Sequence, residues 1–331
     1  MTFTLNSPET QFAIQAVRQA SSLAGQVQAE LVNASLTKDD RSPVTVADLA
    51  SQALVGYQLA REFPGDPLVA EEDSHSLRDP SNGKMLDQVT HYVDLFLPGS
   101  SSAQVCDWID YGGGAPTSRF WTLDPIDGTK GYLRGDQYAI ALALLIDGEV
   151  QVGVLGCPNL SDGYRPDAGG FGSLVVAVRG QGTWTTSLKA PGEFKRLHVS
   201  KRGQPSSTRI LRSFESDHTN ASQVDQLANE LGVATQPVHL DSQAKYAILA
   251  AGEGDLIVRL ISPSKPDYKE KIWDQAAGAL IVEEAGGQIT DLAGLPLDFT
   301  HGRTLRRNRG VLASNGHLHD PALAALRRIG A

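Results

Sequence analysis

The sequence predicts an α/β fold composed of an N-terminal α+β half and a C-terminal α/β half. Three observations support this class: helical periodicity in the first sixth of the chain, two apolar runs joined by a turn within residues 120–155, and alternating strands and helices beyond residue 205. A length of 331 residues corresponds to about two domains. We place the boundary in the polar stretch SKRGQPSST, which divides the chain into residues 1–204 and 205–331.

Two helices and a short strand open the N-terminal half. Apolar residues recur at helical spacing over residues 8–33, and the Ser-Pro pair at the beginning is typical of a helix start. A second helix is expected over residues 47–61, which places Asp48 in its first turn. A short apolar run then predicts a strand over residues 67–70, directly before Glu71, Glu72 and Asp73.

The rest of this half is expected to be irregular at first and then rich in strands. Residues 74–119 are rich in Ser, Gly and Asp without sustained periodicity, so we interpret them as an irregular insertion that acts as a mobile lid. An Asp-Gly pair predicts a hairpin turn after them. The expected strands cover residues 120–123, 138–146, 151–155 and 174–178.

The C-terminal half alternates between strand and helix patterns. Strands are expected over residues 209–212, 236–239, 256–260 and 311–313. Helices are expected over residues 221–231, 243–250 and 273–285. Together they predict a layered α/β arrangement.

Composition narrows the class of partner. The formal net charge is −9, which argues against a nucleic-acid binder that uses a broad basic surface, so the expected partner is a small molecule. The longest strongly apolar run, residues 139–146, is far shorter than a bilayer span, and the first residues lack a signal-peptide pattern. We therefore expect a cytoplasmic protein without membrane association. The oligomeric state stays open, with a monomer favoured.

Acidic residues at the ends of predicted elements are the main chemical signal. Glu71 follows one strand, Asp124 and Asp127 follow another, and Asp274 opens a helix. Converging carboxylates are the ligands that Mg²⁺ prefers. Each residue also has an ordinary explanation, because Asp-Pro starts turns and acids favour helix N-termini.

The run WTLDPIDGTKGYLRG favours the metal interpretation. Gly128 would let backbone N–H groups approach a phosphate, with the Thr129 hydroxyl beside them. A competing interpretation is the haloacid dehalogenase signature, D-x-D-G-T, in which the first Asp is a covalent nucleophile. That interpretation fails because two residues, not one, separate Asp124 from Asp127.

Taken together, E-E, D-P-I-D-G-T and W-D-x-A-A-G resemble the lithium-sensitive inositol monophosphatase and fructose-1,6-bisphosphatase superfamily. The resemblance implies a layered αβαβα sugar-phosphatase fold. Four further stretches are similar to the 3′(2′),5′-bisphosphate nucleotidases within it: KDDRSPVTVADLASQ, DGTKGYLRGDQYAIALAL, HLDSQAKYAILAAGEGDLIVRL and YKEKIWDQAAG.

Site roles follow from this resemblance, residue by residue. It implies two or three Mg²⁺ ions, with lithium as an inhibitor. It implies that Asp48 and Thr129 orient and deprotonate the attacking water. The implied metal ligands are Glu71, Asp124, the carbonyl of Ile126, Asp127 and Asp274. The implied substrate-binding residues are Gly128, Thr129, His218, Ser242, Lys245 and Arg259, although Lys245 and Arg259 could equally be solvated ends of their elements.

The resemblance implies an Mg²⁺-dependent phosphomonoesterase of sulfur metabolism that hydrolyses the 3′-phosphate of adenosine 3′,5′-bisphosphate by metal-activated water. The sulfated precursor, 3′-phosphoadenosine 5′-phosphosulfate, is a further candidate substrate. One alternative is an inositol phosphate or sugar bisphosphate phosphatase of the same fold. Another is a non-catalytic nucleotide sensor, against which the complete set of acidic residues argues.

Overall fold

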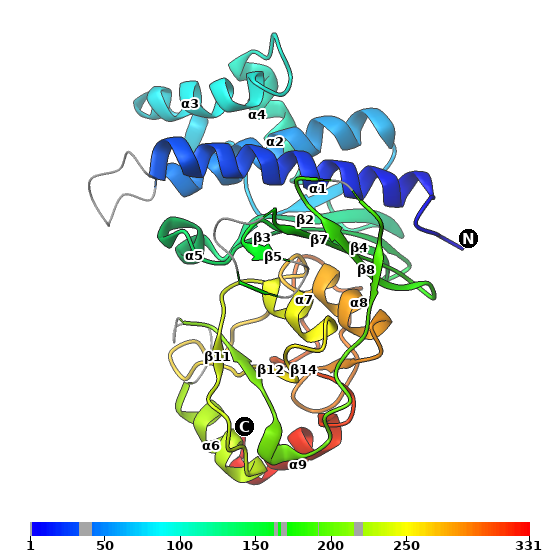
Figure 1. The fold of residues 1–331 in the computed structure, drawn as a ribbon. Coiled ribbons are helices and arrows are strands. Elements are labelled where there is room, and N and C mark those ends of the chain that lie inside the picture. Colours follow the sequence, from blue (N-terminus) through cyan, green and yellow to red (C-terminus); the bar gives the residue numbers. More distant parts are fainter. Residues whose placement is uncertain (1, 33–41, 162–164, 167–170, 191, 215–220) are drawn as a thin grey trace.

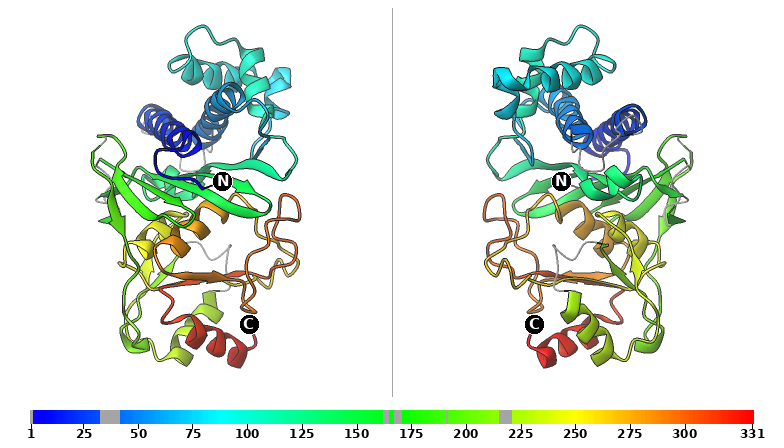
Figure 2. Two further views of the ribbon diagram at one scale, coloured as in Figure 1. Left: turned by 90° about the vertical axis from the view of Figure 1, so that its right-hand side faces the viewer. Right: turned by 90° about the vertical axis from the view of Figure 1, so that its left-hand side faces the viewer.

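The chain folds into five layers in the order helix, sheet, helix, sheet, helix (Figures 1 and 2). The structure is a computed structural model that describes residues 2–32, 42–161, 165–166, 171–190, 192–214 and 221–331. The layered αβαβα arrangement confirms the predicted fold class. No helix of the described residues combines the length and the apolar character needed to cross a membrane.

Two long helices form the first layer. Helix α1 (Pro8–Val27) continues through a π-helical turn (Gln28–Val32), so the helix predicted over residues 8–33 is confirmed as far as residue 32, and residue 33 lies outside the described residues. Helix α2 (Ser42–Glu62) begins five residues before the predicted start at Ala47. The Ser-Pro pair at its beginning is the same start signal that precedes α1, and proline is tolerated in a first helical turn. Asp48 therefore lies in the second turn, not in the first as predicted.

The segment 74–119 is not an irregular lid. It contains two 3₁₀ turns (Ser76–Arg78, Pro80–Asn82) and the helices α3 (Gly83–Asp94) and α4 (Ser102–Asp110). Helix α4 begins with a capping box in which Ser101 and Gln104 bond reciprocally. Both helices bury apolar side chains in the same core as α1 and α2. They were missed because each shows only two or three turns of periodicity between Ser- and Gly-rich connections.

The first sheet has seven strands in the order β1-β2-β3-β4-β7-β8-β9, and all pairs except the parallel β1–β2 pair are antiparallel. The strands predicted in this half are all present, whereas β8 and β9 were not predicted. The strands are β1 (Leu68–Ala70), β2 (Arg119–Asp127), β3 (Ala139–Ile146), β4 (Glu149–Cys157), β7 (Ser173–Val178), β8 (Gly182–Ser187) and β9 (Lys195–Leu197). A separate small pair is formed by β5 (Leu160–Ser161) and β6 (Arg165–Pro166).

The second sheet has the order β11-β10-β12-β14-β13 and mixes parallel with antiparallel pairs. Its strands are β10 (Ile210–Arg212), β11 (Val238–His239), β12 (Leu256–Arg259), β13 (Gln288–Thr290) and β14 (Val311–Ser314). Helices α6 (Ala221–Leu231) and α9 (His319–Ile329) cover its outer face. Of the elements in this half, β13 and α9 were not predicted.

Helices α7 (Ala244–Ala250) and α8 (Ala276–Glu284) form the middle layer between the sheets (Figure 1). Helix α8 begins three residues after the predicted start, so Asp274 lies in the turn before the helix and does not open it. Strand β3 turns Ile140 and Leu142 toward the α1/α2 layer and Ala139 and Ala141 toward the middle layer, because side chains alternate along a strand. The small alanines let the middle helices approach the sheet closely. The core around α7 and α8 therefore contains residues of both sheets.

The predicted domain boundary at 204/205 falls between the two sheets, since β9 ends at Leu197 and β10 begins at Ile210. The middle core contains residues of both halves, so this position marks where the chain passes from the first sheet to the second and does not separate two cores. That residues 1–204 and 205–331 act as two domains stays a prediction.

Candidate active site

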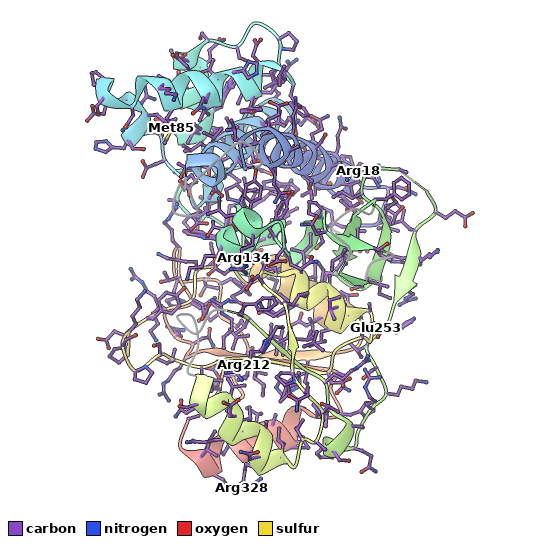
Figure 3. All side chains as sticks on the ribbon, turned by 60° about the vertical axis from the view of Figure 1, so that its left-hand side comes forward. Arg18, Met85, Arg134, Arg212, Glu253 and Arg328 are labelled. Atoms are coloured by element: carbon purple, nitrogen blue, oxygen red, sulfur yellow. The ribbon has the colours of Figure 1, made fainter. Side chains whose placement is uncertain are left out.

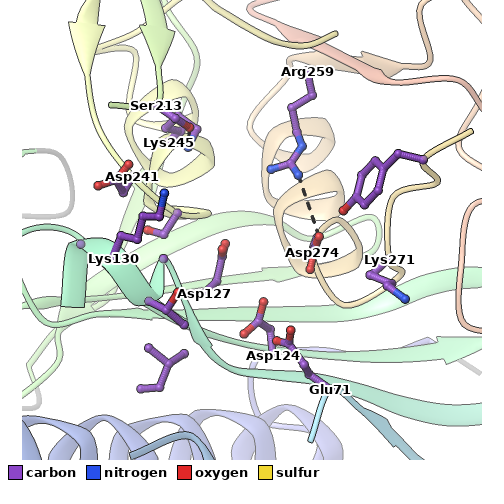
Figure 4. A pocket seen from close by; sticks show the side chains of 16 residues that line it. Glu71, Asp124, Asp127, Lys130, Ser213, Asp241, Lys245, Arg259, Lys271 and Asp274 are labelled. Atoms are coloured by element: carbon purple, nitrogen blue, oxygen red, sulfur yellow. Dashed lines mark hydrogen bonds and ion pairs between the residues drawn. The ribbon is translucent and has the colours of Figure 1, made fainter. Parts of the chain in front are cut away.

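A pocket of about 260 Å³ opens where β2 ends, at the junction of the first sheet with the middle helices (Figure 4). The two halves of the chain contribute its walls. Its lining residues are Glu71, Asp124, Ile126, Asp127, Gly128, Thr129, Lys130, Gly131, Ser213, Asp241, Ser242, Lys245, Arg259, Tyr268, Lys271 and Asp274. All five predicted metal ligands are among them.

The position of the acidic residues follows from the strands that precede them. Strands β1 and β2 are parallel with Ala70 opposite Leu123, so Glu71, directly after β1, lies beside Asp124, which is still paired in β2. In a regular strand Asp124 and Asp127 would point to opposite faces. The register shift between these two residues, around Pro125, instead lets both line the pocket.

Burial and mutual repulsion disfavour the charged forms of these carboxyls. The pKa of Asp124 is raised well above its usual value, first by burial and then by Glu71, Asp127 and Asp274. Burial, followed by the neighbouring charges of Glu72 and Asp127, raises the pKa of Glu71 to about 7. For Asp274 burial outweighs the nearby Arg259 guanidinium, so its pKa is also raised. An acidic cluster of this kind favours either bound protons or a bound cation.

One carboxylate oxygen of the cluster lacks a hydrogen-bond partner in the described part of the chain. Asp124 is 2% exposed, and its Oδ1 atom accepts no hydrogen bond from the described residues. A buried carboxylate oxygen without a partner is costly unless an ion or a water satisfies it. The oxygen donors are those that a hard cation such as Mg²⁺ prefers. As the side chains are placed, however, no three acidic, histidine or cysteine residues of the described chain surround one point at metal-ligand distances.

The acidic cluster makes stability depend on pH. The unfolded chain releases the Glu71 proton near pH 4.5, whereas the folded chain keeps it until about pH 7. The free energy of unfolding of the metal-free protein should therefore fall as the pH rises through this window. Glu71→Gln should make the decline smaller. Urea unfolding in EDTA at about pH 5 and about pH 7.5 measures this, and equal declines in both proteins would contradict it.

A glycine turn follows the acidic residues of β2. Gly128 has φ 92°, in the left-handed region, and a Cβ atom there would lie 2.8 Å from the Cβ of Ser242. Helix α5 (Thr129–Arg134) begins at the next residue, so Thr129 is its first residue and faces the pocket. The turn and the beginning of α5 thus present backbone N–H groups next to the carboxylates.

Asp48 lies behind the acidic cluster. Its carboxyl is 5% exposed, and burial together with Glu72 and Glu71 raises its pKa well above the usual value. It does not line the pocket, and the structure contains no hydrogen bond between the described residues Asp48 and Thr129. The predicted catalytic pair is therefore close to the cluster without a direct contact in this structure.

The second half contributes a strained turn and a buried lysine. Ser242 has φ 64°, which is unusual for a non-glycine residue, and Gln243 N–H donates to Asp127 Oδ2 at 2.6 Å. Lys245 is 5% exposed, and its Nζ donates to Ser213 Oγ at 3.0 Å and to the Leu240 carbonyl at 3.2 Å. Burial lowers the Lys245 pKa to about 8. Lys245 is thus not a solvated helix end.

Arg259 differs from Lys245 because its charge is already paired. Its Nη2 atom lies 2.9 Å from Glu270 Oε2 and 3.9 Å from Asp274 Oδ2, and its side chain is 20% exposed. The solvated-end interpretation is therefore also wrong for Arg259. Of the two cations, only Lys245 lacks a carboxylate within ion-pair distance among the described residues.

Several residues of the site were not predicted. Lys130 and Lys271 both line the pocket. Lys130 directly follows Thr129, and Lys271 lies within the stretch YKEKIWD. Asp241 lines it too and forms an ion pair with Arg134, which lies at the junction of the two halves (Figure 3). Lysine, arginine and aspartate are common on any protein surface, so the sequence offered no means of selecting these three residues as part of the site. The predicted substrate residue His218 lies outside the described residues.

Comparisons with known proteins cover almost the whole chain. The model of the inositol monophosphatase family matches residues 5–331. The 3′(2′),5′-bisphosphate nucleotidase 1 of Candida albicans is 40% identical over 97% of this chain and 95% of its own length. The 3′(2′),5′-bisphosphate nucleotidase of Schizosaccharomyces pombe is 41% identical over 96% and 94%.

Solved structures agree on the fold. The inositol monophosphatase from Anabaena superimposes with a TM-score of 0.62 at 22% identity, over 96% of this chain and 94% of that one. A Thermotoga maritima IMPase superimposes with a TM-score of 0.64 at 20% identity, over 98% of each chain.

Proposed function

The chain belongs to the inositol monophosphatase family, and we propose that it is a 3′(2′),5′-bisphosphate nucleotidase that removes the 3′-phosphate of adenosine 3′,5′-bisphosphate. One observation carries the proposal beyond the family: the pocket joins a carboxylate cluster and a glycine turn to the buried Lys245, which has no carboxylate within ion-pair distance in the part of the chain that the structure describes. The first two features fit the phosphate to be removed. The lysine fits a second anionic group on the same substrate.

Magnesium is the cofactor that the donor set fits. Glu71, Asp124, Asp127, Asp274 and the carbonyl of Ile126 would hold two or three ions, and the unpartnered Oδ1 of Asp124 is the oxygen that most needs one. When bound, the metal would lower the pKa of water and neutralise charge on the phosphate oxygens. Closure of the carboxylates around an ion would require rotation of their side chains, since no three converge as placed.

The residues of the chain would do three things in the reaction. N–H groups at Gly128 and Thr129 would hold the phosphate, as the beginning of a helix does for anions. Thr129 and Asp48 would orient the attacking water and take its proton. Attack would be in line with the leaving 3′-oxygen and direct, so no phosphoenzyme should accumulate.

The alternative function is an inositol phosphate or sugar bisphosphate phosphatase of the same fold, and a further one is a nucleotide sensor without catalysis. Phosphate release should be measured from adenosine 3′,5′-bisphosphate, 3′-phosphoadenosine 5′-phosphosulfate, inositol 1-phosphate and fructose 1,6-bisphosphate. The proposal expects the highest kcat/KM on the first two compounds. A preference for inositol or fructose would support the alternative, and binding of the nucleotide without turnover would identify a sensor.

Lys245→Met should lower kcat/KM for a bisphosphate substrate and leave kcat/KM for a monophosphate substrate unchanged. Loss of one charge-assisted contact costs about 1.5–3 kcal/mol, or ~10- to 100-fold in kcat/KM for adenosine 3′,5′-bisphosphate. Inositol 1-phosphate should be spared, because it has no second phosphate. A pKa of about 8 also predicts that the wild type loses its preference for the bisphosphate as the pH rises above this value.

The matched control for this variant is Lys201→Met, at an exposed position outside the pocket. Equal losses on both substrates would show that Lys245 supports the common phosphate site or the fold. Arg259→Ala is a less direct test, because it would leave the buried Glu270 without its cation.

Lithium at millimolar concentration should inhibit turnover. A small monovalent cation competes for the same hard oxygen donors but carries half the charge of Mg²⁺, so it stabilises the products without supporting the reaction. Phosphate release measured at fixed Mg²⁺ with LiCl or NaCl tests this. Equal rates in the two salts would contradict it.

The proposal includes a monomeric, cytoplasmic enzyme whose partner is a small nucleotide rather than a nucleic acid. The net charge of −9 supports the exclusion of nucleic acid. Analytical ultracentrifugation and cell fractionation test the other two properties.

A further inference from the structure

Arg303 connects two carboxylates of the pocket that are about two hundred residues apart in the chain. It lies in the connection between β13 and β14, and its guanidinium Nη2 donates to the carbonyl of Ala70 at the end of β1. Its Cζ atom also lies 4.8 Å from the centre of the Trp273 ring. The residues that follow these two contacts are Glu71 and Asp274, respectively.

The contact with β1 fixes the peptide plane that leads into Glu71. Because a peptide unit is planar, a hydrogen bond to the Ala70 carbonyl also sets the direction of the Glu71 N–Cα bond. The N–H of Ala70 is bonded on the other side, to the Gly112 carbonyl at 2.8 Å. Both polar groups of Ala70 are thus held by residues outside the first sheet.

The contact with Trp273 is supported by backbone pairing. Ile272 N–H donates to the Arg303 carbonyl at 3.2 Å, and Leu305 N–H donates to the Glu270 carbonyl at 2.9 Å. An antiparallel bridge joins Lys271 to Thr304 between these bonds. The segment that carries Arg303 therefore moves together with the segment that leads into Asp274.

Arg303 is partly buried without an acidic partner among the described residues. Among the described residues no carboxylate lies within 4.0 Å of its guanidinium. Partial burial of the guanidinium lowers its pKa. A planar guanidinium can donate to a carbonyl and stack on an aromatic face at once, whereas an ammonium cannot reproduce both contacts.

We propose that Arg303 is a positioning residue that fixes the backbone from which the Glu71 and Asp274 side chains reach toward a divalent cation. The inference rests on the metal site of the proposed function. Residues that orient metal ligands without touching the metal typically change metal affinity 10- to 100-fold when they are replaced. Arg303→Met keeps the aliphatic stem of the side chain but loses the planar guanidinium and its charge.

The experiment is a titration of each protein with Mn²⁺ by electron paramagnetic resonance, without substrate. Arg303→Met should bind Mn²⁺ ~10- to 100-fold more weakly than the wild type, and Arg303→Lys should recover little, because the charge alone does not reproduce the geometry. Arg306→Met is the control, since Arg306 is exposed on the same connection. In steady-state kinetics at saturating Mg²⁺, the Arg303 variants should keep the substrate KM and approach the kcat of the wild type.

Several results would overturn the inference. Unchanged Mn²⁺ affinity in Arg303→Met would do so, as would full recovery in Arg303→Lys or an equal loss in Arg306→Met. The titration should also be repeated well below the melting temperature of Arg303→Met. If the variant then binds Mn²⁺ as tightly as the wild type, Arg303 contributes to stability alone. If Arg303→Met does not fold, the same titration of Arg303→Lys decides: weaker Mn²⁺ binding supports the inference, and wild-type affinity overturns it.

Failure of the proposed function would look different. A wild type that binds no Mn²⁺ would remove the metal site and this inference with it. A wild type that binds Mn²⁺ but releases no phosphate from nucleotides would contradict the nucleotidase, and the role of Arg303 would still be decided by the titration.

Discussion

Asp124→Asn should lower kcat more than ~100-fold, because a direct ligand must matter more than the surrounding groups, whose loss costs 10- to 100-fold. The substitution removes one negative charge from the acidic cluster. The metal-free variant should nevertheless be at least as stable as the wild type, since burial already disfavours the charged form of Asp124. Phosphate release at a series of Mg²⁺ concentrations and the melting temperature in EDTA measure both effects.

The control for this prediction is Asp87→Asn, at an exposed position of α3. It should change neither property. Wild-type activity should vanish in EDTA and return with Mg²⁺. Full activity in Asp124→Asn, or in the wild type with EDTA, would exclude the metal mechanism. A large fall in the melting temperature of the variant would instead show that Asp124 maintains the fold.

Asp48→Asn and Thr129→Ala should each reduce kcat ~10²- to 10⁴-fold, the usual contribution of a positioned proton acceptor, while KM changes little. The structure makes this prediction demanding, because Asp48 and Thr129 are not hydrogen-bonded to each other. If they act as one unit when the substrate is bound, the double variant should be little worse than either single variant.

Ser51→Ala is the matched control on the same helix, since Ser51 is fully buried and its Oγ has no partner among the described residues. Its kcat should stay near that of the wild type. Losses that multiply in the Asp48/Thr129 double variant would mean that the two residues work separately. Equal effects of Ser51→Ala and Asp48→Asn would point to general disturbance of α2.

The fold was predictable where a segment is long and its pattern is strong. The apolar run of β3 is buried on both faces, so a continuous run predicts it, and the Asp147-Gly148 turn fixes its pairing with β4. The strands β8 and β9 were missed because β8 has only one large apolar side chain, Trp184, and β9 is only three residues long. Short elements of this kind are determined by their neighbours in the sheet.

The site was predictable as a set of residue types and not as a geometry. The motifs select Asp124, Asp127 and Asp274, and the pocket brings these together. No spacing rule could predict the register shift that turns Asp124 and Asp127 to one side. The pairing of Arg259 with Glu270 was equally hidden, because the two residues are brought together only by the fold.

The contribution of residues 74–119 shows the same limit. Their composition indicated a loop, yet the Gly112 carbonyl bonds Ala70, and a side chain at Gly112 would collide with the buried amide of Gln52. The glycine tripeptide at residues 112–114 thus supports β1. Glycines that make room for a neighbour cannot be distinguished by sequence from glycines that form turns.

The middle helix layer also constrains how such a gene can be rearranged. Helices α7 and α8 are encoded in the second half, yet they cover the alanine face of the first sheet, where Gly153 has no room for a Cβ atom because it would lie 2.9 Å from the Ala277 carbonyl. A chimera that exchanges everything after residue 204 between two relatives would therefore replace one side of this contact and keep the other. Crossovers at the apparent boundary should yield fewer folded chimeras than exchanges confined to α6 and α9, which pack on the outer face of the second sheet and against each other.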